Sequence, residues 1–187
     1  MTKHKDHSET QISSEAVFDG KLLHVKRDRV RHHDGSEAVR EYIEHNGAAV
    51  IIPLLDSGEL VMERQYRYAV RDHCLELPAG KIDPGEDPLA AAKRELLEET
   101  GYAASEWHYL ATIHPTVSYS TERIMIYFAR GLTHEGSALD EGEFLEVLHM
   151  RLDELLGLVH NGTITDVKTV IGLFWMEKIA AGEWHPE

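Results

Sequence analysis

Apolar and polar residues alternate along the first part of the chain with the period of β-strands. Over residues 16–45 (AVFDGKLLHVKRDRVRHHDGSEAVREYIEH), Asp19-Gly20 and Asp34-Gly35 add turn signals to this alternation. The pattern predicts two or three antiparallel strands, which are too few to be stable alone and should pack against another surface, plausibly a second subunit. The polar residues 1–14 are expected to be frayed.

From Ala48 onward the apolar runs become longer and indicate buried strands. Residues 48–55 (AAVIIPLL) predict one strand, residues 56–58 (DSG) a hairpin turn, and residues 60–67 (LVMERQYR) the strand that returns from it. Further strands are predicted at residues 74–78, 107–114, 123–130 and 143–150.

Three segments carry helical signals. Asp87 and Pro88 suit the N-cap and the first helical position, Gly101 supplies a C-terminal stop, and an apolar stripe between them is formed by Leu89, Ala92 and Leu96. Residues 151–162 predict a second helix. Asp166 caps a third one, and the residues expected to face inward there are Val170, Leu173, Phe174 and Ile179. Strands with one central helix and two C-terminal helices predict a mixed α/β sandwich.

Composition excludes several classes of function. The 187 residues carry a net charge of −14, with 42% apolar and 28% charged residues, which is typical of a soluble globular domain. No basic stripe suits a nucleic acid, and no apolar run approaches the length of a membrane span. The single cysteine, Cys74, lies in an apolar run and fits packing in a reducing compartment, so a cytoplasmic protein is expected.

A crowded group of carboxylates raises the question of what stabilises it. Glu95, Glu98 and Glu99 share one face of the predicted central helix, because positions three and four apart are neighbours. Each like-charge pair costs about 0.2–0.5 kcal/mol. A divalent cation would offset this cost, since hard cations such as Mg²⁺ prefer oxygen ligands. The alternative is that these glutamates form an ordinary solvent-exposed acidic face of the helix. That interpretation would be favoured if ELLEE (residues 95–99) stood alone, without other residues at fixed spacing from it.

The spacing around these glutamates resembles the Nudix box. Residues 80–102 read GKIDPGEDPLAAAKRELLEETGY, and they match the box at Gly80, Glu86, Arg94-Glu95-Leu96, Glu98-Glu99 and Gly101-Tyr102. The flanking QYR at residues 65–67 and LELPAGKID at residues 75–83 resemble the branch of ADP-ribose and nucleoside-diphosphate-sugar pyrophosphatases.

The resemblance implies a fold and an oligomeric state. It implies a Nudix α/β/α sandwich with a mixed sheet, formed by residues 45–187, and a small N-terminal antiparallel β-sheet, formed by residues 1–44. In the branch, such a sheet is exchanged between the subunits of a homodimer.

The resemblance also implies site residues. Glu95, Glu99 and the backbone carbonyl of Ala79 would be direct ligands of Mg²⁺, for which Mn²⁺ is a possible substitute, and Glu98 would join them. Arg94 lies four residues before Glu98 and can hold that carboxylate in orientation.

The general base would come from a loop glutamate in the C-terminal half. LDEGEFLEV offers Glu141, placed ahead of Glu143, with Asp140 and Glu146 as weaker candidates. For the substrate, Arg67 resembles a phosphate-binding arginine and Glu122 a residue facing the active site. Candidates in the N-terminal sheet, which sheet packing explains equally well, are Phe18, Tyr42, Arg27 and Arg31.

The expected reaction is metal-dependent hydrolysis of the pyrophosphate bond of ADP-ribose, to AMP and ribose 5-phosphate, or of a related nucleoside diphosphate sugar. Pro115 lies closer to the box than is usual for ADP-ribose hydrolases, and the segment after it lacks the glycine of their SPG version. GDP-mannose or another nucleotide sugar therefore stays open as substrate. A non-catalytic Nudix regulator is a further alternative, although such proteins commonly lose box glutamates that are all present here.

Overall fold

The computed structural model describes residues 6–136 and 144–186, which form two compact units. One unit consists of the residues up to Asn46 together with Thr116–Glu122. The other consists of Gly47–Pro115 and the residues from Arg123 onward. Each unit is described by itself below.

The first unit is an antiparallel sheet of three strands, as the alternating pattern predicts. The strands run in the order β1 (Thr10–Asp19), β2 (His24–Arg31) and β3 (Glu37–Glu44). The expectation of a frayed start as far as residue 14 is wrong, because β1 pairs with β2 from Thr10 onward. The segment Thr116–Glu122 joins this sheet: the N–H of Ile43 donates to the carbonyl of Tyr119 at 2.9 Å.

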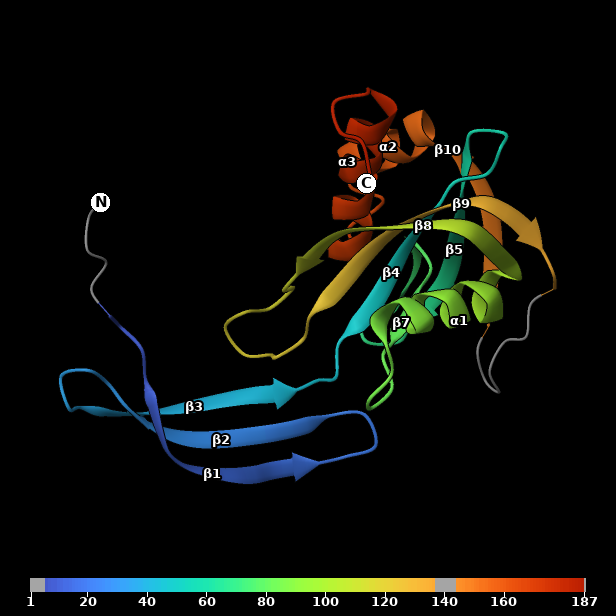
Figure 1. The fold of residues 1–187 in the computed structure, drawn as a ribbon. Helices are drawn as coiled ribbons and strands as arrows, with labels where there is room; N and C mark the ends of the chain where they lie inside the picture. The colour runs from blue at the N-terminus through green and yellow to red at the C-terminus, as the bar shows by residue number, and fades with distance from the viewer. Residues whose placement is uncertain (1–5, 137–143, 187) are drawn as a thin grey trace. The chain divides into compact units, whose positions relative to one another are not determined.

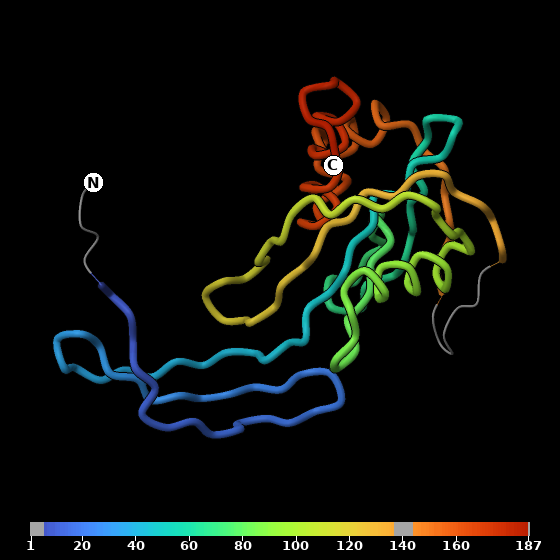
Figure 2. The backbone as a smooth tube through the Cα atoms, in the orientation of Figure 1, coloured from blue at the N-terminus to red at the C-terminus, as the bar shows by residue number. Residues whose placement is uncertain are grey.

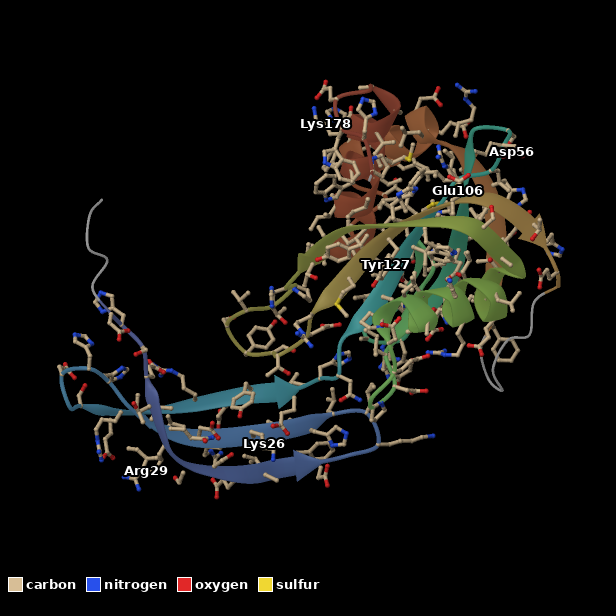
Figure 3. All side chains as sticks on the ribbon, viewed as in Figure 1. Lys26, Arg29, Asp56, Glu106, Tyr127 and Lys178 are labelled. Carbon is tan, nitrogen blue, oxygen red and sulfur yellow. The ribbon has the colours of Figure 1, made fainter. Side chains whose placement is uncertain are left out.

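Charged pairs stabilise the register of this sheet. Lys26 and Arg29 of β2, both labelled in Figure 3, pair with Glu44 at 3.4 Å and with Glu37 at 2.6 Å on β3. Every residue of β1 is exposed in the single chain, so burial in the chain itself does not explain its apolar side chains. The exposed apolar side chains in and beside β1 are those of Ile12, Val17, Phe18, Leu22 and Leu23.

The second unit contains two sheets. A four-stranded mixed sheet has the order β7 (Ala79–Lys81), β4 (Ala48–Pro53), β9 (Ile124–His134) and β8 (Tyr102–Ile113), in which β4 and β9 are parallel. A three-stranded sheet has the order β10 (Leu145–Arg151), β5 (Glu59–Arg67) and β6 (Asp72–Glu76).

The prediction of a hairpin between residues 48–55 and 60–67 is therefore wrong in its pairing. The turn is present, with Gly58 at φ 85°, but the pairing stops at an isolated bridge between Leu54, just after β4, and Leu60 of β5. All six residues of β4 are buried, and the strand pairs with β7 and β9 instead.

Helices cover both faces of the mixed sheet (Figure 1). Ala49 and Ile51 of β4 pack on the side of α1 (Pro88–Thr100), together with Tyr127, which is labelled in Figure 3. Val50 and Ile52 pack on the opposite side, where α2 (Leu152–His160) and α3 (Val167–Ala180) close the core. This arrangement is the predicted α/β/α sandwich, and alternate residues of one strand supply its two cores.

The inner face of α3 differs from the prediction at one position. Phe174 is exposed, whereas Thr169, Gly172, Leu173 and Met176 are buried. Gly172 lies so close to the connection between β6 and β7 that a Cβ placed on it would be 2.5 Å from Leu77 Cδ1. Two small residues therefore mark the buried face, and a search for large apolar side chains overlooks them. Of the helices in the described residues, none has the length and apolar character needed to cross a membrane.

Candidate functional site

The glutamate-rich helix has a well-defined start and end. Figure 2 shows the backbone passing from β7 through residues 82–87 into α1. Asp87 accepts hydrogen bonds from the N–H groups of Leu89 at 3.0 Å and Ala90 at 3.1 Å, and Gly101 ends the helix at φ 75°. These caps fix the first and last turns, and with them the direction in which each glutamate points.

Arg94 binds three of the box acids at once. Its guanidinium donates to Glu86 at 3.0 and 3.1 Å, to Glu95 at 2.9 Å and to Glu98 at 3.0 Å. A further bond of 3.1 Å goes to the backbone carbonyl of Lys81. The bond to Glu86 is the largest cause of a pKa for Arg94 above its ordinary value. Arg94 thus offsets part of the crowding of negative charge and ties the loop after β7 to α1.

Glu95 occupies the space above Gly80. A Cβ built on Gly80 would lie 1.8 Å from the carboxyl carbon of Glu95, so no residue with a side chain fits there unless Glu95 moves. The box glycine is therefore required by close approach rather than by an unusual backbone angle, since its φ is not in the left-handed region.

Glu99 lies deeper and has different partners. It is 8% exposed, and its Oε2 accepts the N–H of Ala79 at 3.1 Å. Its carboxyl group also meets that of Glu63 of β5, which is 3% exposed. Burial, followed by the charge of Glu63, raises the pKa of Glu99 far above its ordinary value. Among the described residues, no lysine or arginine forms an ion pair with either carboxyl group.

Two basic residues near Glu63 and Glu99 form ion pairs with another acid, Glu76. Arg67 donates to both oxygens of Glu76, at 2.7 and 2.8 Å, and Lys168 bonds to Glu76 and, at 2.9 Å, to Asp166. Burial alone would raise the pKa of Glu76, but the bonds from Arg67 and the charge of Lys168 lower it to about 2. Arg67, the expected phosphate ligand, is thus half-exposed and held in a bidentate pair by Glu76.

The donors present fit a hard cation. Glu95, Glu98, Glu99 and the backbone of Ala79 offer only oxygen atoms as ligands, and Oε1 of Glu63 is buried without any partner. In residues 6–136 and 144–186, no three His, Cys, Asp or Glu side chains yet stand close enough together to enclose an ion. Coordination by these residues therefore requires the glutamate side chains to draw together around the ion.

The other predicted residues lie elsewhere. Glu141 and Glu143, the candidate bases, fall outside the described residues. Arg27 belongs to the first unit and bonds to Glu41 at 2.8 Å and Glu15 at 3.2 Å. Phe18 and Glu122 also belong to the first unit, where Phe18 is 56% exposed.

Three residues of the site were missed from the sequence: Glu63, Glu76 and Lys168. Glu63 follows Leu60, Val61 and Met62, all fully buried. Since residues 61 and 63 point to the same face of a strand, burial of Val61 implies burial of Glu63. A glutamate at the end of an apolar run was the available signal.

Comparison with known proteins gives two family matches. A model of the NUDIX domain matches residues 45–170, and a model of the nucleoside diphosphate sugar hydrolase N-terminal domain matches residues 9–43. Together they span both units of the chain.

Individual relatives are similar over almost their whole length. An ADP-ribose pyrophosphatase of Mycobacterium tuberculosis is 39% identical over 184 residues, covering 97% of this chain and 89% of the relative. A methanol dehydrogenase activator of Bacillus methanolicus is 35% identical over 171 residues, or 90% and 92% of the two chains. Among solved structures, an ADP compounds hydrolase matches with a TM-score of 0.84 at 27% identity, over 96% of this chain and 98% of the other.

Proposed function

The chain belongs to the NUDIX hydrolase family, and from this premise we propose that it hydrolyses the pyrophosphate bond of ADP-ribose or a related nucleoside diphosphate sugar with Mg²⁺. The relative named as an ADP-ribose pyrophosphatase supports this substrate class, and the match of residues 9–43 to a nucleoside diphosphate sugar hydrolase domain agrees with it. With ADP-ribose the products would be AMP and ribose 5-phosphate.

The observation that carries the proposal is that the box acids differ in whether they have a basic partner. Arg94 forms ion pairs with Glu86, Glu95 and Glu98, whereas Glu99 has no basic partner among the described residues. Burying a carboxyl group without a counter-charge is costly, and a bound cation would supply the missing charge. Such buried ionisable groups are typical of functional sites.

The residues of the chain would act by positioning and by charge. Glu95, Glu98, Glu99 and the Ala79 carbonyl would hold Mg²⁺, which when bound neutralises diphosphate oxygens and lowers the pKa of water. Arg94 orients Glu95 and Glu98 through its bonds at 2.9 and 3.0 Å. Glu141, or Glu143, would accept the proton of the attacking water. Arg67, Glu122, Arg27 and Phe18 would contact the substrate.

A substrate panel tests the proposal. Purified protein with Mg²⁺ is assayed against ADP-ribose, GDP-mannose, UDP-glucose, a diadenosine polyphosphate and NADH, with Mn²⁺ in parallel. Glu99→Gln should fold normally but lose turnover at saturating Mg²⁺, by about 100-fold or more if Glu99 holds the cation. Wild-type rates in this variant would remove Glu99 from the site.

The panel also separates the alternatives. Preference for GDP-mannose would identify a different nucleotide sugar as the substrate and leave the reaction class unchanged. The choice of base and sugar depends on the loops and not on the box. No hydrolysis of any compound by the wild type would favour a non-catalytic regulator, a possibility that the relative named as an activator brings with it. The complete set of box acids supports the hydrolase instead.

We propose in addition that the protein is a homodimer in which residues 1–44, which belong to the first unit, supply the contact. The support is the exposure of the whole of β1 and of the apolar side chains beside it in a single chain. A second copy of the chain that packs on β1 would remove these apolar side chains from water and so stabilise the sheet.

A further inference from the structure

Glu63 is an acid that neither the box nor its flanking motifs contain. It lies in the middle strand of the three-stranded sheet, where its backbone pairs with Val147 of β10 and Glu76 of β6. The side chain is 3% exposed, and its Oε1 has no hydrogen-bond partner. A buried polar atom without a partner is rare in folded proteins and calls for an explanation.

The neighbours of Glu63 make the missing partner more notable. Its carboxyl group meets that of Glu99 on α1, and Glu76 lies opposite it in the adjacent strand. The two cations close enough to act on Glu63, Arg67 and Lys168, are bonded to Glu76. A third carboxyl group is therefore buried beside Glu76 and Glu99, where the nearby basic side chains already bond to Glu76.

Ordinary packing does not account for this side chain. The residues before it, Val61 and Met62, are fully buried and apolar, so Glu63 is the one residue in this buried part of the strand that bears the cost of desolvating a carboxyl. A carboxyl group that adjoins a proposed cation ligand and keeps one oxygen without a donor can supply that oxygen to a hard cation.

We propose that Glu63 is a further carboxylate of the cation site, and that the divalent cation bound by Glu99 is shared with Glu63. This inference rests on the proposed function, because Glu99 must hold a cation for Glu63 to share it. With Glu63 from β5 and Glu99 from α1, the ion would bridge the three-stranded sheet and the box helix. Binding of the ion would then tie these two elements together as well as serve hydrolysis.

The test measures metal binding without substrate. Free Mn²⁺ is followed by electron paramagnetic resonance during titration of the wild type, Glu63→Gln and Glu63→Met. Glutamine keeps the shape and one oxygen but removes the charge, so its Mn²⁺ affinity should fall by about 10-fold or more. Glu59→Gln, at the partly exposed start of the same strand, is the control and should bind as the wild type does.

Thermal unfolding gives a second readout with a distinctive sign. In EDTA, Glu63→Gln and Glu63→Met should melt at or above the temperature of the wild type, because an unpaired buried acid has been removed. With saturating Mn²⁺, the wild type should gain more in melting temperature than either variant, since only it keeps the full affinity. If the glutamine variant does not fold, the methionine variant carries both measurements.

The outcomes distinguish this inference from the proposed function. If the wild type binds no Mn²⁺, the proposed function fails, and the inference fails with it. If the wild type binds Mn²⁺ and the folded Glu63 variants bind it with less than a 10-fold loss, only the inference is overturned. In that case Glu63 would touch Glu99 without sharing its ion.

Discussion

At the scale of single residues, the crowding of the box glutamates has two different answers. Arg94 bonds to Glu86, Glu95 and Glu98 at 2.9 to 3.1 Å and offsets part of their mutual repulsion. Glu99 has no such partner and instead meets Glu63. The contact between Arg94 and Glu98 was predictable from the sequence, because residues four positions apart are neighbours on a helix. Glu63 comes from a distant strand, and nothing local in the sequence shows that it meets Glu99.

The close contact between Gly80 and Glu95 predicts that Gly80→Ala displaces the glutamate. A Cβ would lie 1.8 Å from the carboxyl carbon, so Glu95 must leave its place. Hydrolysis and Mn²⁺ affinity should each fall by about 10-fold or more, because a misplaced ligand weakens the site. Both are measured on the same preparation.

Gly157→Ala is the matched control for this substitution. Gly157 lies in α2 with open space around it, so alanine there should leave activity unchanged and stabilise the protein by about 0.4–1 kcal/mol. Unchanged Mn²⁺ affinity in Gly80→Ala would show that the position of Glu95 does not matter for binding.

The bonds around Glu76 predict a pH-dependent contribution to stability. Its folded pKa, about 2, is below the ordinary value of 4.5, so the unfolded state binds more protons between these values. The contribution, about 3 kcal/mol, is therefore complete above pH 4.5 and is lost as the pH falls toward 2.

Urea unfolding of the wild type and Glu76→Gln at a series of pH values checks this. The free energy of unfolding of the variant should lie below that of the wild type near neutral pH, and the two should converge as the solution becomes more acidic. A constant difference down to the acid limit would mean that Glu76 does not titrate with the fold.

At the scale of elements, most strands and all three helices were predictable, because turn residues, caps and apolar periods are local signals. Asp87, Pro88 and Gly101 bound α1 as expected. The pairing of β5 was not predictable in the same way. The turn after β4 favours a hairpin, but the choice of sheet depends on strands far along the chain, and β5 pairs with β6 and β10. The buried face of α3 was partly missed because Thr169 and Gly172, small residues, form much of it.

The cap of α1 predicts the effect of changing Asp87. Asp87→Ala removes the acceptor for two N–H groups and should cost about 1 kcal/mol of stability. Asp87→Asn keeps a side-chain oxygen at the cap and should change stability by only a few tenths of a kcal/mol. Chemical unfolding of the three proteins checks the order, and equal losses in both variants would assign the effect to charge instead of capping.

At the scale of the whole molecule, the exposed apolar side chains of the first unit are the surface on which the proposed dimer depends. In a dimer, the first units of the two subunits would each bury apolar side chains that the single chain exposes. Val17 of β1 is 44% exposed, and Val167 at the start of α3, in the second unit, is 45% exposed. Because the two side chains are alike in type and exposure, a substitution at Val167 is a suitable control for the same substitution at Val17.

If the first unit forms the dimer contact, Val17→Lys should weaken dimerisation by about 10-fold or more, because an unpaired charge is costly to bury. Val167→Lys should leave the dimer intact. Sedimentation velocity over a range of concentrations measures both. A wild-type protein that stays monomeric at all concentrations contradicts the proposed dimer, and an equal effect of the two substitutions would place the contact elsewhere.

The bonds that join Ile43 to Tyr119 and Thr121 have a bearing on how the protein is made. A neighbouring bond, from His45 to Thr121, connects residues 76 positions apart. A ribosome adds about 5–20 residues per second, so the first three strands emerge about 4–15 s before the segment that completes their unit. During that interval the nascent chain exposes an unfinished sheet edge, which makes this stage of synthesis the one at which help from a chaperone would matter most.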